Sequence, residues 1–471
     1  MQILIKATYI TQKLIQYYYK NKLQQIASYS DELYLAFENE KYYLMSEILY
    51  SWADRQQKVS IGTLWSQQKH YRLLDTIHQQ FDYFGELLEH TLAGLQYLRE
   101  KFDHEAFDLL YSKFQQFAHY FLYYSIIVSR QPPSVVIKCG DAENHRRSRF
   151  WFNTEIRILG GRAFGLDVHG RDSEVQCFLI TDDTARQLLT NAYYNVFDNE
   201  EFLIEPTTAI FALKNEQGLK AKFDDMRVSK KGQLRRDSVA TKRYCLCYNI
   251  QMQASHGITL VGKKVSLPFA ILVGPKSDVE ARLFLERSFA DLVKRPLSEM
   301  PQSVHFSKMA EALEMKFQAI VETAQKPTDE PLIIQPRMFT SKEKEHIILR
   351  LKPTADGQIV LENFLKLAVC QEYTTKRASS EGEWKLVAFF DWFFKIAEII
   401  NKYLYQMWTD GLIYGFCGKD EAENLLRMCS RSCLLIRFSD VEYGKIKISV
   451  RYRNGGLYTY FFKYSFISSE T

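Results

Sequence analysis

A single arginine lies in the middle of a run of large apolar residues near the end of the chain. The segment CLLIRFS, residues 433–439, is typical of a β-strand, in which side chains alternate between two faces. Arg437 then shares one face with Leu435 and Ser439. A guanidinium in such a strand is costly unless it meets an anion, and its planar donors suit phosphate or carboxylate. The alternative is an arginine that extends from an edge strand into solvent.

A predicted helix with a lysine precedes this strand. It begins near Gly418 and has acidic residues in its first turns, as the helix dipole favours. Ala422, Leu425 and Leu426 form an apolar stripe, and Lys419 lies on the same side one turn earlier. The sequence therefore predicts a helix, a turn and a buried strand, with one cation on the helix and one in the strand.

The stretch from Trp392 to Ser439 resembles a known family. Helix, turn and buried strand with a central arginine resemble the opening of an SH2 domain, which binds phosphotyrosine. WTDGLIYGF at residues 408–416, the lysine-bearing helix and the strand LLIRFS are together similar to the STAT family (signal transducers and activators of transcription). The resemblance implies that Arg437 binds two phosphate oxygens, that Lys419 adds a point charge and that Ser439 donates a hydroxyl.

The chain is long enough for about three or four domains. It has 471 residues, of which 46% are hydrophobic and 25% charged, and a net charge of +5 that permits an acidic partner. No signal peptide is apparent, and the longest aromatic-apolar run, residues 117–128, is too short to span a bilayer. Eight cysteines without framework spacing indicate reduced thiols. We therefore expect a protein of the cytoplasm and nucleus, without membrane insertion.

Motifs for catalysis or for binding metals and cofactors are missing from the sequence. No glycine-rich phosphate loop, Ser-His-Asp order or paired-carboxylate motif occurs, and Gly160-Gly161 alone does not make such a loop. Cys245 and Cys247 would point the same way along a strand, but no Cys/His quartet completes a zinc site. We expect no enzyme, no catalytic residue, no metal and no cofactor.

Residues 1–131 are expected to form an antiparallel four-helix coiled-coil bundle. This stretch contains no proline and few glycines. Residues spaced alternately three and four positions apart form a heptad seam, which comprises Leu74, Ile77, Phe81, Phe84, Leu88, Thr91, Leu95 and Leu98. Three more helices are predicted at about 1–28, 31–56 and 103–129. We interpret the bundle as a scaffold whose exposed faces offer docking surface to protein partners.

Three further domains are expected, which makes the chain a multidomain α+β protein. Short β-type runs separated by Gly, Asp and Asn fill residues 132–302 and favour an immunoglobulin-like sandwich or barrel. RQP followed by VIKCG, and SLP followed by FAILV, are similar to the borders of the DNA-binding domain of STAT proteins. Helical periodicity over 303–402, with an exposed insertion near 373–382, predicts a helical linker. Residues 403–471 are assigned to an SH2 domain that is incomplete at its C-terminal end.

A cluster of basic residues around Gly232 is the candidate DNA-binding surface. It comprises Arg227, Lys230, Lys231, Arg235, Arg236, Lys242 and Arg243. A place between β-segments favours contact with the phosphates of double-stranded DNA, while the alternative is a solvated basic loop. The basic dipeptides Lys230-Lys231 and Arg235-Arg236 could also be recognised by the nuclear import machinery, and the two roles are compatible. Against the family pattern, Lys242-Arg243 replaces two acids and Gly274 replaces a base-reading asparagine, so we expect altered or weak sequence preference.

Other departures from the family lie near the C-terminus. Asp440 and Val441 replace a glutamate and a serine of the STAT pattern. Relative to the family, the chain to Thr471 has no N-terminal oligomerisation domain, no tail tyrosine and no activation segment. We therefore expect a short divergent member or isoform that does not dimerise by reciprocal phosphotyrosine exchange.

Three functions are compatible with these features. The sequence predicts a STAT-like, signal-dependent transcription factor that binds a tyrosine-phosphorylated receptor or STAT-like protein. One alternative is a phosphotyrosine-binding signalling adaptor. Another is a dominant-negative truncated isoform without sequence-specific DNA binding.

Overall fold

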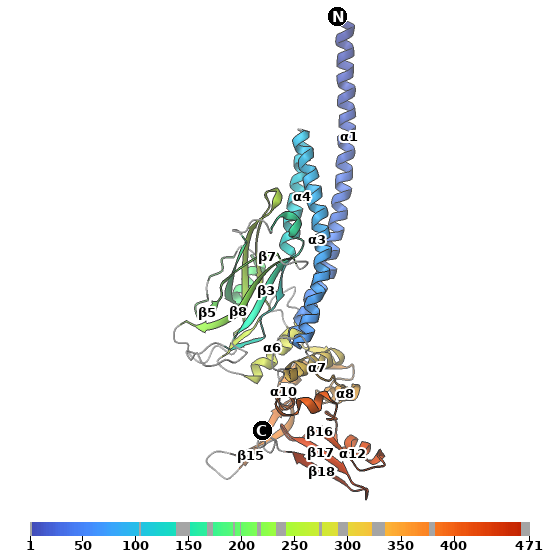
Figure 1. Ribbon diagram of the computed structural model, residues 1–471, viewed down its shortest axis with the longest axis vertical. Helices are drawn as coiled ribbons and strands as arrows, with labels where there is room; N and C mark the ends of the chain where they lie inside the picture. The colour runs from blue at the N-terminus through green and yellow to red at the C-terminus, as the bar shows by residue number, and fades with distance from the viewer. Residues whose placement is uncertain are drawn as a thin grey trace.

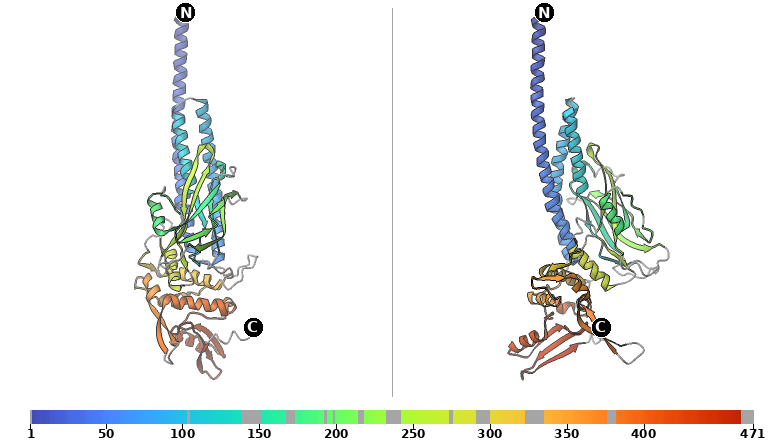
Figure 2. Two further views of the ribbon diagram at one scale, coloured as in Figure 1. Left: turned by 90° about the vertical axis from the view of Figure 1, so that its left-hand side faces the viewer. Right: turned by 180° about the vertical axis from the view of Figure 1, so that it is seen from behind.

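The molecule is elongated, with a helical bundle at one end and a small mixed domain at the other (Figure 1). Helix α1 projects beyond the other helices, and the larger β-sheets lie beside the bundle (Figure 1, Figure 2). The computed structural model describes residues 2–102, 105–137, 151–166, 173–191, 194–197, 199–213, 218–231, 242–272, 276–290, 300–322, 335–375 and 382–462.

Three long helical segments, rather than the four expected, form the bundle. The first segment is continuous and consists of α1 (Gln2–Tyr42), a π-helical stretch (Tyr43–Leu49) and α2 (Tyr50–Val59). The second segment is α3 (Leu64–Lys101), and the third is α4 (Glu105–Tyr124). The expected break near residue 30 does not occur because no proline or glycine lies there. Ser30 instead donates its hydroxyl to the Ile26 carbonyl oxygen of the same helix, at 2.8 Å.

The predicted heptad seam is confirmed as the buried face of α3. Leu74, Phe81 and Leu88 are fully buried in the core that the bundle shares with the sheets. Helix α4 ends at Tyr124, before the predicted end near residue 129. The chain leaves the helix there because the β-branched segment Ile126–Arg130 pairs with a strand of the sheet.

Two antiparallel sheets make up most of the β-region. One has the order β1-β3-β8-β5 with β7 paired to β8, the other has the order β10-β9-β4-β6, and β2 and β11 form a parallel pair. The described strands form open sheets and do not close into a barrel. Their bounds are β1 (Ile126–Arg130), β2 (Val135–Ile137), β3 (Phe152–Ile158), β4 (Glu174–Thr181), β5 (Phe202–Glu205), β6 (Thr208–Ile210), β7 (Ala212–Leu213), β8 (Leu219–Lys230), β9 (Tyr244–Gln253), β10 (Thr259–Val265) and β11 (Ala270–Leu272), with α5 (Asp182–Thr190) following β4.

A buried ion cluster joins the bundle to the first sheet. Arg157 of β3 is fully buried and donates to Glu155 and to Asp75 of α3, each at 2.9 Å. Tyr71 of α3 donates to the same Glu155 at 2.6 Å. Burial alone would raise the pKa of Glu155, but the hydrogen bonds from Tyr71 and Arg157 lower it below its usual value.

The region expected to be a helical linker is mixed. Within residues 303–402 the helices are α7 (Phe306–Glu322), α8 (Ser341–Leu349), α9 (Leu361–Lys366) and α10 (Phe389–Ile399), which continues as a π-helical stretch (Ile400–Leu404). Helix α6 (Ser277–Phe289) precedes this region and α11 (Tyr405–Thr409) follows it. Two strand pairs accompany them, β12 (Ser303–His305) with β13 (Gln358–Val360) and β14 (Ala368–Thr375) with β15 (Gly382–Ala388). The described ends of the predicted insertion belong to the paired strands β14 and β15, on which the rings of Tyr373 and Trp384 pack 5.1 Å apart. Residues 376–381 of the insertion lie outside the described residues.

The C-terminal part is a three-stranded antiparallel sheet with one helix. Helix α12 (Lys419–Met428) begins after Gly418, as predicted, and the strands follow in the order β16 (Cys433–Phe438), β17 (Ile446–Arg451) and β18 (Leu457–Phe462). Strands β17 and β18 form an antiparallel hairpin. This sheet lies at the end of the molecule opposite the tip of α1 (Figure 1).

Candidate phosphate-binding site

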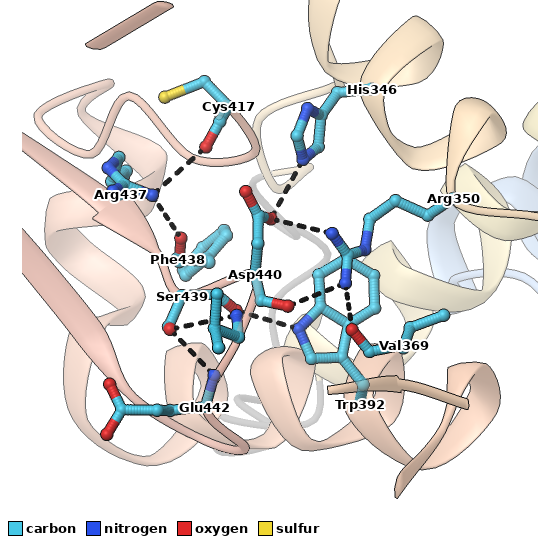
Figure 3. Close-up of polar contacts among 11 residues, drawn as sticks. His346, Arg350, Val369, Trp392, Cys417, Arg437, Phe438, Ser439, Asp440 and Glu442 are labelled. Atoms are coloured by element: carbon cyan, nitrogen blue, oxygen red, sulfur yellow. Dashed lines mark hydrogen bonds and ion pairs between the residues drawn. The ribbon is translucent and has the colours of Figure 1, made fainter. Parts of the chain in front are cut away.

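Arg437 is buried and has no carboxylate partner among the residues that the structure describes. Its strand β16 lies at the edge of the sheet, but only 2% of the residue is exposed, so it does not extend into solvent. Its Nη1 donates to the carbonyl oxygens of Cys417 and Phe438, both at 3.4 Å (Figure 3). Its Nε has no hydrogen-bond partner. A buried cation held by two such long hydrogen bonds would be strongly stabilised by an anion.

The two faces predicted for this strand are confirmed. Leu435 packs with Ala422 and Leu426 of α12. Phe438 lies in the opposite core, which belongs to the linker helices. Arg437 therefore faces the helix that carries the predicted lysine.

The WTDGLIYGF segment places a backbone turn beside Arg437. Gly415 forms a parallel bridge with Arg437 and has a φ of +97°. A Cβ at this position would lie 2.0 Å from Oε1 of Glu343, so the close approach requires glycine. Phe416 is buried against Phe438 with ring centroids 4.7 Å apart. The motif thus anchors the strand to the linker core and leaves the guanidinium on the other side.

A second cation, Lys447, faces Arg437 from the neighbouring strand. The two residues are register partners in β16 and β17, and 13% of the Lys447 side chain is exposed. The nearest carboxylate oxygen, on Glu442, lies 3.9 Å from its Nζ. Burial and the positive charge of Arg437 lower the pKa of Lys447. Two neighbouring cations with so little counter-charge favour a doubly charged anion.

Lys419 lies at the rim of this site. It is the first residue of α12, its side chain is 69% exposed, and it forms an ion pair with Glu423 at 3.6 Å. Its charge contributes to the lowered pKa of Lys447. No hydrogen bond joins it to Arg437 in the part of the chain described, so Lys419 belongs to the electrostatic surroundings rather than to the buried centre.

The third predicted residue, Ser439, organises the loop that follows β16. It is 1% exposed, and its Oγ accepts the backbone N–H groups of Glu442 at 3.1 Å and Val441 at 3.4 Å. The linker strand β14 holds the same loop from outside. Gln371 donates its N–H to the Val441 carbonyl and accepts the N–H of Tyr443, both at 2.9 Å. The loop is therefore fixed before any ligand binds.

Asp440 fastens this loop to the linker through side chains (Figure 3). Its carboxylate lies 3.0 Å from Nε2 of His346 and 3.5 Å from Nη1 of Arg350. Arg350 also donates to the Asp440 backbone carbonyl at 2.7 Å, and Trp392 donates to that of Ser439 at 3.0 Å. The sequence analysis did not connect Asp440 with these residues, because their spacing in the chain carries no signal of the contact.

Two of the predicted DNA-binding residues, Lys242 and Arg243, form ion pairs with acidic residues of the same chain. Lys242 forms an ion pair with Glu201, and this contact lowers the pKa of the Glu201 carboxyl. Arg243 donates two hydrogen bonds of 2.9 Å to Glu286 of α6 and is largely buried. These two bases attach the β9 strand to its surroundings.

The other basic residues lie at the end of β8 or beyond it. Arg227 pairs with Glu205 at 2.6 Å, and Lys231 donates to the Asn199 carbonyl at 3.0 Å. Lys230 has no ion-pair partner among the described residues. Arg235, Arg236 and the family-divergent Gly274 lie outside the described residues.

The described residues hold no group of three or more His, Cys, Asp or Glu side chains arranged to bind a metal ion. Seven cysteines fall within them, all as free thiols. In this same part of the chain, no helix has both the length and the apolar character needed to cross a membrane.

The helical bundle, the open sheets, the mixed linker and the small C-terminal sheet together make this a multidomain α+β protein. Residues 6–123, which are the helical bundle, match the family model described as signal transducer and activator of transcription b N-terminal. Over 450 residues the chain is 61% identical to signal transducer and activator of transcription b of Caenorhabditis elegans, an alignment that covers 95% of this chain and 79% of the relative. The chain therefore belongs to the STAT family, as its sequence predicted. The members of this family are signal transducers and transcription factors, not enzymes.

Proposed function

We propose that this STAT-family chain binds phosphotyrosine at Arg437 and regulates transcription by binding DNA through its β-sheets. Phosphotyrosine binding is supported by one observation, the buried guanidinium of Arg437, which has no carboxylate partner within the described residues. Arg437 would take two phosphate oxygens, Lys447 would neutralise further charge, and Lys419 would attract the ligand from the rim. The partner is then a tyrosine-phosphorylated receptor or another STAT-like protein.

The phosphotyrosine proposal is tested with peptides. A degenerate phosphotyrosine peptide pool, the same pool with unphosphorylated tyrosine, and phenyl phosphate as competitor are compared by fluorescence anisotropy. We expect the phosphorylated pool to bind and phenyl phosphate to displace it. Equal binding of the phosphorylated and the unphosphorylated pool would refute the proposal that Arg437 binds phosphotyrosine.

DNA binding is proposed for Lys230, Lys231 and the nearby Arg235 and Arg236. Lys242 serves as the control because its ion pair with Glu201 already occupies its charge. A selection from random duplexes should enrich a motif, and changing the four residues to Gln should flatten the salt dependence of binding. Lys242→Met should leave that salt dependence unchanged. These functions place the chain in both cytoplasm and nucleus.

The adaptor is the second candidate function. It is favoured by the ion pairs of Arg227, Lys242 and Arg243, since three of the seven predicted phosphate contacts already have acidic partners, which are Glu205, Glu201 and Glu286. If no motif is enriched and binding is only non-specific and salt-sensitive, the chain is an adaptor or a dominant-negative isoform.

A further inference from the structure

A cavity of about 400 Å³ lies where the helical bundle meets the sheets. Helices α2, α4 and α5 line it together with strands β1 and β10 and the SLP segment that follows β10. Most of its walls are aromatic or aliphatic, and they include Trp52, Tyr123, Tyr124, Leu188 and Pro268. An apolar cavity of this size with a few polar groups is typical of small-molecule sites.

Lys264 brings a positive charge into this cavity. Its Nζ lies 4.4 Å from the ring centroid of Tyr123 and 5.8 Å from that of Tyr124. No carboxylate forms an ion pair with it among the residues described, and burial lowers its pKa to about 8. The ammonium is therefore charged at neutral pH and is held by ring faces instead of a counter-ion.

Tyr123 can lie close to strand β10 because residue 262, two positions before Lys264, is a glycine. Gly262 and Lys264 share one face of β10, because side chains alternate along a strand. A Cβ at Gly262 would lie 2.6 Å from Cε2 of Tyr123, so only glycine lets the ring lie against the strand. The Gly-x-Lys spacing thus places the ammonium on the ring at the cavity wall.

We infer that this cavity binds a small aromatic or aliphatic monocarboxylate whose carboxylate pairs with Lys264. The apolar body of the ligand would lie beside Trp52 and Leu188. Lys264 matches a single negative charge, whereas inorganic phosphate would lose its hydration against largely apolar walls without enough donors to replace it. Lys263 also lines the cavity, but it lies on the opposite face of β10 from Lys264. This site is separate from Arg437 and does not depend on the proposed phosphotyrosine function.

The test compares two probes of the same shape on the whole chain. Isothermal titration calorimetry with 2-naphthoate should show one site per chain, and the neutral 2-naphthamide should bind at least about tenfold more weakly. Lys264→Met keeps the apolar stem and should weaken naphthoate binding about tenfold. Lys222→Met removes an exposed lysine outside the cavity and should change nothing. Ala53→Phe, which fills the cavity from α2, should abolish binding of both probes.

Several results would overturn the inference. The first is equal affinity of the wild-type chain for 2-naphthoate and 2-naphthamide. The second is an unchanged naphthoate affinity in Lys264→Met, and the third is no binding of 2-naphthoate to the wild-type chain. Thermal unfolding of each variant separates loss of the site from loss of the fold. If Ala53→Phe unfolds the protein, the Lys264→Met and Lys222→Met pair still decides the question.

Discussion

Replacing Arg437 by methionine should remove phosphopeptide binding while making the small C-terminal sheet more stable. Methionine fills the space of the arginine stem and carries no charge. The stability gain is expected because, among the residues that the structure describes, Arg437 makes only two hydrogen bonds, both of 3.4 Å, and its Nε makes none. A buried charge with so little compensation costs free energy, and apolar replacement of buried charges typically stabilises by about 1–4 kcal/mol.

The binding loss follows from the contacts that a phosphate would make. Two charge-assisted hydrogen bonds contribute about 1.5–3 kcal/mol each, so their removal costs at least about 3 kcal/mol. This corresponds to a rise in Kd of roughly a hundredfold or more.

Arg451 offers a matched control in the same sheet. Its Nη1 donates to the carbonyl oxygens of Leu426, Arg427 and Cys429 at the end of α12, where a helix leaves carbonyls without partners. Arg451→Met should therefore destabilise the sheet and leave phosphopeptide affinity nearly unchanged. Amide hydrogen exchange of β16, β17 and β18 measures the local stability, because the whole chain is too large for two-state unfolding. Our reasoning is refuted if Arg437→Met destabilises the sheet as much as Arg451→Met does and still binds phosphopeptide.

Three further outcomes are expected. In anisotropy titrations, Lys447→Met should raise the phosphopeptide Kd about tenfold, because Lys447 is mostly buried. Lys419→Met should raise it by less than about threefold, because solvent screens this exposed lysine. Equal effects of the two variants would contradict this difference. Arg350→Met should release the loop after Ser439, because it removes the hydrogen bond to the Asp440 carbonyl oxygen. Amide hydrogen exchange in the loop should rise and phosphopeptide binding should weaken severalfold. Unchanged exchange would show that β14 alone holds the loop. Since the pKa of Glu155 is lowered on folding, its stabilising effect is present above its usual value of 4.5 and is lost as the pH falls below it. Arg157→Met should destabilise the contact between the bundle and the sheet by about 3–5 kcal/mol at neutral pH, and it should shrink or reverse this acid loss, because burial then raises the pKa of Glu155; amide hydrogen exchange of α3 and β3 across pH 3–7 measures both effects.

The sequence predicted the parts of the site and fold that depend on local pattern. The seam of α3 was found because its spacing alone determines which side chains are buried. Arg437 was found because one charged residue interrupts an apolar strand. Lys447 was missed because KIKISV reads as an ordinary amphipathic strand with lysines toward solvent. Only the pairing register of β16 with β17, a long-range property, places that lysine beside Arg437.

The same limit explains the elements that were wrong. A break near residue 30, between two predicted helices, was expected, yet nothing local interrupts the helix, and residues 43–49 continue it as a π-helical stretch. The β14–β15 hairpin was not predicted because its pairing is set by contacts with the linker core rather than by its own alternation.

The basic residues show how a count of charges can mislead about nucleic-acid binding. Lys242 and Arg243 stand where the STAT pattern has two acids, and a count along the sequence adds their positive charges to a DNA-binding surface. In the structure each has an acidic partner elsewhere, Glu201 or Glu286, so the local charge is balanced. The substitutions therefore act on how β9 is held to the β5 strand and to α6. Any DNA affinity of this region has to come from the remaining bases, and this makes the choice between transcription factor and adaptor a question about Lys230 and its neighbours.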